Sequence, residues 1–79
     1  MIKKAFGKQV RKIRQEKQIT QEELSQKTGL ANRFLQDIEA GNKQASITTV
    51  FRLADGLQVS PNELVEIPYA AWKKAGKPV

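Results

Sequence analysis

Residues 20–41, TQEELSQKTGLANRFLQDIEAG, decide the fold of this chain. Thr20 followed three residues later by Glu23 is the pattern of a capping box, in which each residue bonds the backbone of the other at a helix start. Gly29 can adopt the positive φ that a tight turn between helices requires. Leu35 and Ile38 then lie three residues apart, as on the buried side of a second helix. The segment therefore predicts two short helices, the second from residue 32 to about 39, joined by a tight turn.

Apolar residues at helical spacing predict a longer helix before this pair. Ile2, Phe6, Val10 and Ile13 recur three or four residues apart, which places them on one face of a helix from about residue 2 to about residue 17. Lysines and arginines fill most of the remaining positions, so the other faces are expected to meet water. Gly7 is expected to weaken this helix slightly, by up to about 1 kcal/mol relative to alanine.

Two more helices are predicted after residue 45. Ser46 can cap the first, which closes near residue 57. Its expected apolar stripe comprises Ile47, Val50, Phe51, Ala54 and Leu57, with Leu53 alongside. Ser60 and Glu63 form a second capping box, with Pro61 at the first helical position, and Pro68 is expected to stop or bend the chain. The sequence thus predicts an all-α domain of five helices in residues 1–67 and a tail in residues 68–79 that forms a dimer contact or a short extra helix.

The composition argues against an enzyme. The 79 residues include no cysteine and no histidine, so the chain lacks the commonest metal ligand and the commonest general base. The adjacent carboxylates Glu22 and Glu23 are explained by their place at a helix start. We therefore expect no catalytic residue, no metal and no cofactor. The apolar runs are too short to span a membrane and the N-terminus lacks a signal peptide, so a cytoplasmic protein is expected.

The positive charge is concentrated in the first helix. The net charge of the chain is +6, and residues 1–17 alone carry seven basic residues against one acid. Such a segment indicates an anionic partner, either nucleic acid or a membrane surface. It is equally compatible with a solvated helix face that only aids solubility.

Three polar side chains stand at the exposed start of the second short helix. Asn32 and Arg33 begin it, and Gln36 follows one turn later. Arginine is the commonest partner of guanine O6 and N7, and asparagine and glutamine suit adenine. A helix with such residues at its start, held by a partner helix, fits the major groove of DNA. Phe34 can contact a thymine methyl group or a sugar, but packing against the core is the favoured interpretation.

The chain resembles the lambda-repressor-like helix-turn-helix proteins, also called the Cro/xenobiotic-response-element type, from about residue 6 to about residue 64. The resemblance rests on linked motifs at fixed spacing: TQEEL at 20–24, TGL at 28–30, IEAG at 38–41 and LADGLQVSP at 53–61. It implies a compact five-helix DNA-binding domain whose helix-turn-helix comprises helices 2 and 3. Two positions depart from the family pattern, since Ala31 replaces a residue that often caps the recognition helix and Thr28 replaces a more apolar one.

The resemblance also implies a set of contacts to DNA phosphates, which position a protein without specifying sequence. Gln21 begins the first motif helix, where relatives bond a phosphate and brace the recognition helix. Asn42 and Lys43 match positions that hold the phosphate backbone, and Arg14 is expected to contact a phosphate from the flank. The remaining lysines of the first helix are expected to supply mainly a long-range field.

Because one recognition helix contacts only a few base pairs, relatives usually bind as two-fold dimers on near-palindromic sites. The fifth helix is the common dimer surface of the family. The candidates for that surface here are Leu64, Val65, Ile67, Tyr69 and Trp72. Tyr69 and Trp72 equally fit a role in covering the core of their own domain.

The function that the resemblance implies is a sequence-specific transcriptional regulator, a repressor or autoregulator that binds double-stranded DNA. The chain is similar in this respect to restriction-modification controller proteins and to small phage or plasmid regulators. A second interpretation is an antitoxin, a DNA-binding protein of the same fold whose main task is to mask a toxin partner. An apolar patch left free around Tyr69 and Trp72 after dimerisation would favour the antitoxin.

Overall fold

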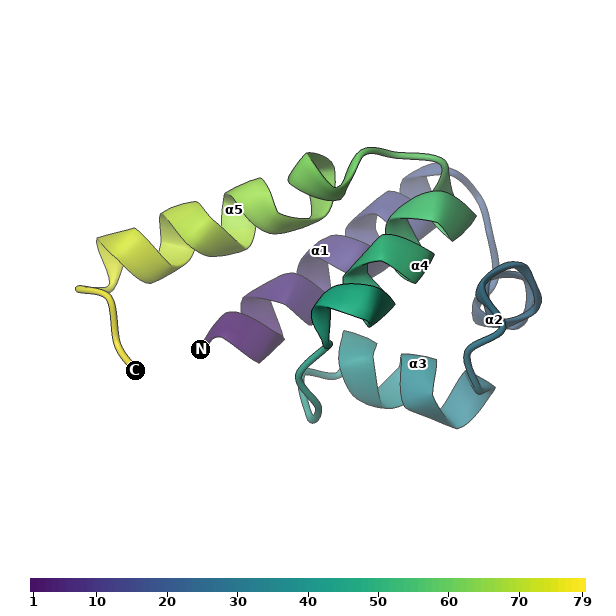
Figure 1. Cartoon of the computed structure of the whole chain (residues 1–79), viewed down its shortest axis with the longest axis horizontal. Coiled ribbons are helices and arrows are strands. Elements are labelled where there is room, and N and C mark those ends of the chain that lie inside the picture. Colours follow the sequence, from purple (N-terminus) through teal and green to yellow (C-terminus); the bar gives the residue numbers. More distant parts are fainter.

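The chain folds into five α-helices, and the computed structural model describes all 79 residues. The helices are α1 (Ile2–Glu16), α2 (Gln21–Thr28), α3 (Asn32–Glu39), α4 (Ile47–Leu57) and α5 (Pro61–Lys74), shown in Figure 1. This arrangement confirms the predicted all-α, five-helix architecture with the helix-turn-helix at α2 and α3.

The predicted capping signals define the helix starts. At α2, the Glu23 amide donates to Thr20 Oγ1 at 3.0 Å, and the Thr20 amide donates to Glu23 Oε1 at 3.0 Å. Ser60 and Glu63 form the same reciprocal pair at the start of α5. Gly29 ends α2 with a φ of 74°, the left-handed conformation that the turn was predicted to need.

The end of α5 differs from the prediction. Pro68 does not stop the chain, because α5 continues through it to Lys74. A proline inside a helix removes one backbone hydrogen bond and crowds the preceding turn. The missing bond is the one that residue 68 would donate to the carbonyl of Leu64. Both residues are buried, so the inner face of α5 is packed at each end of this gap. Packing of α5 against α1 offsets the local cost of the proline.

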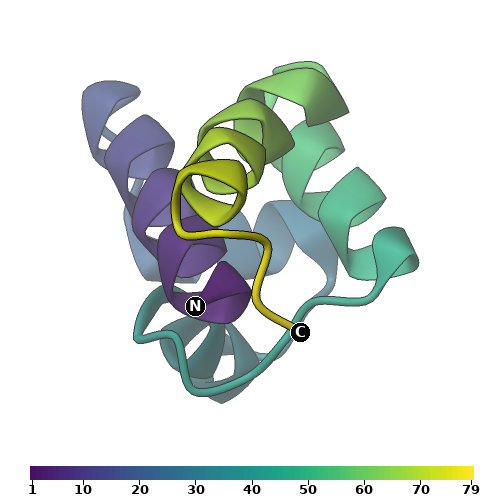
Figure 2. The ribbon, with the colours of Figure 1, turned by 90° about the vertical axis from the view of Figure 1, so that its left-hand side faces the viewer.

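Eleven apolar side chains from all five helices form one core. They are Phe6, Val10, Ile13, Leu24, Leu35, Ile38, Val50, Leu53, Ala54, Leu57 and Leu64. α1 lies at the centre of the arrangement and packs against α3, α4 and α5, while α2 packs against α3 and α4 (Figures 1 and 2). α3 is therefore held from one side by α1 and from the other by α2.

The buried face of α4 is narrower than the predicted stripe. Ile47 is 67% exposed and Phe51 55% exposed, so the prediction that both pack into the core is wrong. The buried face is centred instead on Leu53 and Leu57, with Val50 and Ala54 beside them. At 100° per residue, Ile47 and Phe51 lie toward one edge of that face. They leave an apolar strip on the surface of the monomer.

Gly7 has a packing role that the sequence did not suggest. It is buried where α1 crosses α3, and a Cβ atom at this position would lie 2.0 Å from the carbonyl oxygen of Ile38. Only a residue without a side chain allows this approach. Gly7 therefore sets the distance between the basic helix α1 and the end of α3.

Candidate nucleic-acid interface

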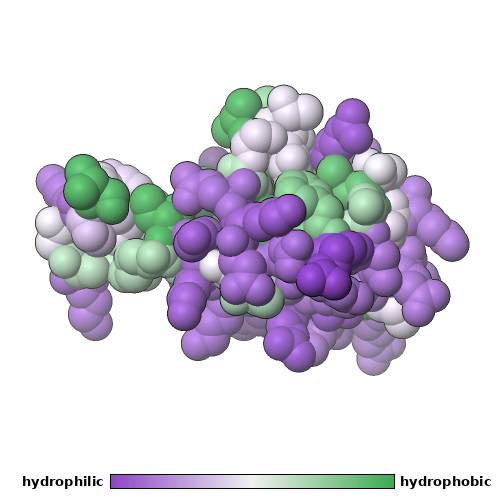
Figure 3. All heavy atoms as spheres, turned by 90° about the horizontal axis from the view of Figure 1, so that it is seen from below, coloured by the Kyte–Doolittle hydropathy of each residue, from purple (hydrophilic) through white to green (hydrophobic).

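α3 is amphipathic in the way that a groove-binding helix requires. Leu35 and Ile38 are fully buried on its inner side. On the outer side the Arg33 side chain is 84% exposed, Gln36 is exposed and Asn32 is half-buried. α3 is the lowest helix in Figure 1, and the view from below shows a face covered mostly by hydrophilic side chains (Figure 3). The structure thus brings the three predicted base-contact residues together on one surface.

The turn between α2 and α3 is held by side-chain hydroxyls. Ser25 donates a hydrogen bond to the carbonyl oxygen of Leu30. The Thr28 hydroxyl donates to the Leu24 carbonyl at 2.7 Å and accepts from the Leu30 amide at 3.2 Å. The polar residue at position 28 is therefore satisfied within the turn. Ala31 precedes α3 without a side-chain cap, as its identity predicts.

A buried polar network fixes α3 to α1 and α2. The guanidinium of Arg14 binds both carboxylate oxygens of Glu39, at 2.7 and 2.9 Å, and donates a third bond to the Ile19 carbonyl at 2.8 Å. Gln21 Nε2 donates to the same carboxylate at 3.1 Å. The Arg14 and Glu39 side chains are only 11% and 3% exposed. The bidentate pair joins α1 to the C-terminal end of α3, and the bond from Gln21 joins α2 to the same carboxylate.

This network changes the interpretation of Arg14. Each of its three guanidinium nitrogens already makes a bond within the protein. The geometry therefore favours a bracing role for Arg14 over the phosphate contact that the sequence predicted. For Gln21, the bracing part of the prediction is present in the structure, through its bond to Glu39.

A second group of charges ties the α3–α4 loop to the outer face of α3. Asp37 lies 3.6 Å from the Arg33 guanidinium and 3.8 Å from the Lys43 ammonium. The Lys43 ammonium also stands 5.9 Å from the centroid of the Phe34 ring. Phe34 is partly buried and packs against the core, as favoured from the sequence. Lys43 is thus held beside α3, with exposed Asn42 next to it.

A polar hollow opens between the starts of α2 and α3 and the outer side of α1. The residues that line it are Arg11, Arg14, Thr20, Gln21, Glu22, Asn32 and Gln36. None of them is hydrophobic, and two of them are predicted base-contact residues. Asn32 Oδ1 is buried there without a hydrogen-bond partner in the chain. Arg11 is the residue that sequence reasoning missed, because its closeness to Asn32 and Gln36 depends on the packing of α1 against α3.

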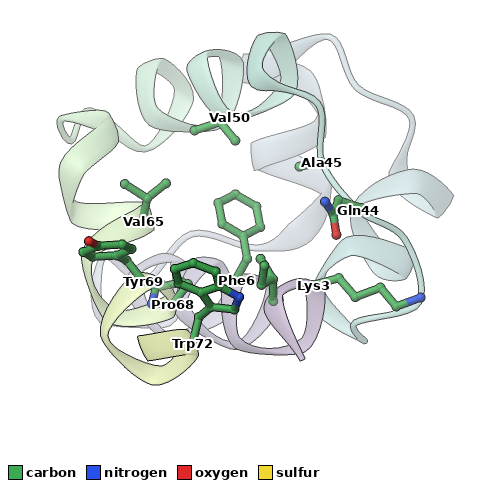
Figure 4. Close-up of a pocket in the computed structure, with 10 residues that line it drawn as sticks. Lys3, Phe6, Gln44, Ala45, Val50, Val65, Pro68, Tyr69 and Trp72 are labelled. Carbon is green, nitrogen blue, oxygen red and sulfur yellow. The ribbon is translucent and has the colours of Figure 1, made fainter. Parts of the chain in front are cut away.

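An apolar groove of about 360 Å³ lies on another side of the molecule, between α1, α4 and α5. Tyr69 and Trp72 of α5 border it, with Phe6 on its floor and Val50 opposite (Figure 4). Tyr69 is 57% exposed, whereas Trp72 is half-buried and its indole N–H donates to the Pro78 carbonyl at 2.6 Å. Of the other predicted dimer residues, Val65 and Ile67 are exposed.

Leu64 is an exception among the predicted dimer residues. It is fully buried in the core of its own chain. It therefore cannot present its side chain to a partner in this fold, and the prediction that places it on the dimer surface needs this correction.

Comparison with known proteins identifies the family. The family model described as helix-turn-helix (HTH_3) matches residues 10–64, more than half of the chain. The chain belongs to the lambda-repressor-like helix-turn-helix family. It is 34% identical over 64 residues to the HTH-type transcriptional regulator y4dJ of Sinorhizobium fredii, a match that covers 81% of this chain and 83% of the relative. It is 32% identical over 66 residues to the control protein C.BamHI of Bacillus amyloliquefaciens, covering 82% of each.

A solved structure in this family has the same fold. The restriction-modification controller protein C.AhdI from Aeromonas hydrophila superposes with a TM-score of 0.77 at 31% identity, over 78% of this chain and 94% of that chain. The helix-turn-helix chain described here is a DNA-binding transcriptional regulator and not an enzyme. None of its five helices combines the length and apolar content needed to cross a membrane.

Proposed function

We propose that this chain is a sequence-specific regulator that binds a near-palindromic operator as a homodimer and acts in the cytoplasm as a repressor or autoregulator. One observation carries the proposal: α3 buries Leu35 and Ile38 while its opposite side presents Arg33 and Gln36 to solvent. A helix braced on one side and free on the other can enter the major groove without rearrangement. The similarity to C.BamHI and C.AhdI supports a controller-type regulator.

Within this proposal, Arg33 donates to guanine O6 and N7, and Asn32 and Gln36 bond neighbouring base edges. The Oδ1 of Asn32 is buried and has no hydrogen-bond partner in the chain, so this side chain must turn outward for the oxygen to accept a bond from a base. Contacts to phosphates come from three further residues. These are Gln21 at the start of α2, and Asn42 and Lys43 in the loop after α3.

The dimer surface in this proposal is the apolar side of α4 and α5. Its exposed side chains are Ile47, Phe51, Val65 and Tyr69, with half-buried Trp72 at the edge of the groove. Exposed Ile67 lies apart from them, in a hollow that it lines with Lys4 and Lys8 of α1. An exposed apolar surface on a small domain commonly marks an interaction site. A second copy of the chain is the partner that gives two recognition helices related by a two-fold axis, which a near-palindromic operator demands.

A selection from random double-stranded oligonucleotides with the purified chain tests the proposal. The expected product is an enriched motif of two half-sites related by a dyad, with centres about 34–36 Å or a multiple apart. A pool that stays random after repeated rounds would contradict sequence-specific binding. An enriched motif with a single half-site would contradict the dimer and leave specific binding intact.

A further inference from the structure

A basic ridge runs along one face of α1. Lys4, Lys8 and Arg11 are spaced four and three residues apart, which places them in line on the helix surface. All three are exposed, and none is among the residues that form ion pairs with acids. Like charges one turn apart on a helix repel each other and destabilise it, so binding of an anionic partner would relieve this repulsion.

Contacts at both ends fix where the basic ridge lies. At its N-terminal end, Lys4 packs against Gly41, since a Cβ atom on Gly41 would lie 2.6 Å from Lys4 Cγ. Gly41 directly precedes Asn42 and Lys43. At its C-terminal end, Arg11 lines the polar hollow together with Asn32 and Gln36. The ridge therefore links the loop after α3 to the hollow at the start of α3.

We propose that the basic ridge of Lys4, Lys8 and Arg11 binds the phosphodiester backbone of the duplex directly, along the flank of the recognition helix. From Lys4 to Arg11 the helix rises about 10 Å. Each DNA strand carries one negative charge about every 3.4 Å along the duplex axis, so about three phosphates of one strand fall within that length. This inference rests on the proposed function, in which α3 enters the groove, and it adds a second line of contact beside it.

The network around Arg14 explains why this role falls to Arg11. The Arg14 guanidinium is engaged by Glu39 and Ile19, whereas Arg11 is exposed and makes no hydrogen bond or ion pair within the chain. The two residues lie one turn apart on α1. Continuity with the DNA interface favours a nucleic acid over an acidic protein as the partner of the ridge.

The test measures binding of the full chain to the selected operator and to a random duplex by fluorescence anisotropy across a salt series. The test variant is Lys8→Ala/Arg11→Ala. The matched control, Lys27→Ala/Arg52→Ala, removes the same two residue types on the side where α2 meets α4, since Lys27 lies near Gly56 and Arg52 near Gly29. All four residues are exposed, so thermal unfolding of both variants should match that of the wild type.

For the test variant, the slope of log K against log salt should become less steep by about 2 per bound chain. Two phosphate contacts are lost, and each contributes about 0.9 to the steepness. Affinity falls to the same degree on operator and random DNA, so the ratio between them is kept. The control variant keeps the wild-type slope. Equal slopes for the two variants would overturn the inference. A wild type that binds both duplexes equally would instead contradict the proposed function. In that case, the salt slopes of the two variants on random DNA would still show whether the basic ridge contacts phosphates.

Discussion

Arg33 is the residue on which the proposed sequence preference depends most. Its side chain is 84% exposed and lies 3.6 Å from Asp37, one turn along α3. We expect Arg33→Ala to weaken binding to the selected operator by about 1–3 kcal/mol and to relax the preference at one base pair, because a bidentate bond to guanine is lost. Competition with operators substituted at each position measures this. Equal weakening on every sequence would show that Arg33 contacts a phosphate.

Arg14 is expected to contribute to stability more than to DNA contact. Arg14→Ala leaves the Glu39 carboxylate, 3% exposed, without its cation. Breaking a buried pair in this way typically costs about 3–5 kcal/mol. Urea denaturation should show this loss, and the double variant Arg14→Met/Glu39→Leu should recover much of it because no charge is left buried. A single variant as stable as the wild type would contradict the bracing role.

The packing roles of Arg14 and Gly7 could not be predicted from the sequence, whereas the exposure of Arg33 and Gln36 on the surface of α3 could. Exposure along one helix follows from its own periodicity. The partner of Arg14 is 25 residues away in the sequence, on a helix whose position depends on the whole core. The same holds for Arg11, whose place beside the hollow requires the crossing of α1 and α3.

At the scale of the elements, the contact between α1 and α3 depends on Gly7. Gly7→Ala should improve the intrinsic propensity of α1 by about 1 kcal/mol. The new methyl group would meet the Ile38 carbonyl, a backbone atom that cannot rotate away. Overpacking of this kind costs about 1–3 kcal/mol or more, so we expect net destabilisation. Thermal unfolding checks this, with Gln15→Ala on the exposed side of the same helix as the control. A stabilised Gly7→Ala variant would show that α1 and α3 can separate freely.

The start of α2 should make stability depend on pH in the acid range. The backbone hydrogen bond from Thr20, reinforced by the Thr20 side chain, lowers the pKa of Glu23 from its ordinary value of 4.5. A carboxyl whose pKa is lowered in the folded state stabilises the fold above the unfolded-state value. That contribution is lost as the pH falls from about 4.5 through the lowered pKa. Denaturation of the wild type and of Glu23→Gln is measured from about pH 6 to about pH 3. As the pH falls, the free energy of unfolding should decline less in the variant than in the wild type. Parallel curves would contradict the capping role of the carboxylate.

Helix starts and turns were predictable because their signals are local. The Thr20–Glu23 and Ser60–Glu63 pairs and the left-handed Gly29 act within a few residues of chain. The continuation of α5 through Pro68 was not predictable, because it depends on packing against α1. The exposure of Phe51 was missed for a related reason, since apolar identity alone does not show which edge of a helix meets the core.

Across the whole molecule, the polar hollow and the apolar groove share no lining residue. The basic ridge and the exposed side of α3 meet around the polar hollow, while Val65, Tyr69 and Trp72 of α5 line the groove with Val50 of α4. Ile67 is an exception among the exposed apolar residues of α5, since it lines a hollow with Lys4 and Lys8. A dimer formed through α4 and α5 would leave both recognition helices uncovered. In the proposed assembly, this arrangement would let one chain bind a partner copy and a duplex at the same time.

The dimer can be tested without disturbing the core or the DNA-binding surface. Phe51 and Val65 are 55% and 37% exposed in the monomer. The double variant Phe51→Gln/Val65→Gln should therefore keep the monomer fold and its charge. Burial of such a side chain at an interface is worth about 1–2 kcal/mol. A two-fold dimer buries each side chain twice, so the dimer dissociation constant should rise by about 30-fold or more for each substitution. Sedimentation equilibrium measures this constant, and Gln26→Ala on α2 serves as the surface control.

In the Phe51→Gln/Val65→Gln variant, binding to a two-site operator should lose cooperativity, while binding to an isolated half-site stays as in the wild type. A wild type that remains monomeric on its operator, or a variant that dimerises as well as the wild type, would place the partner surface elsewhere.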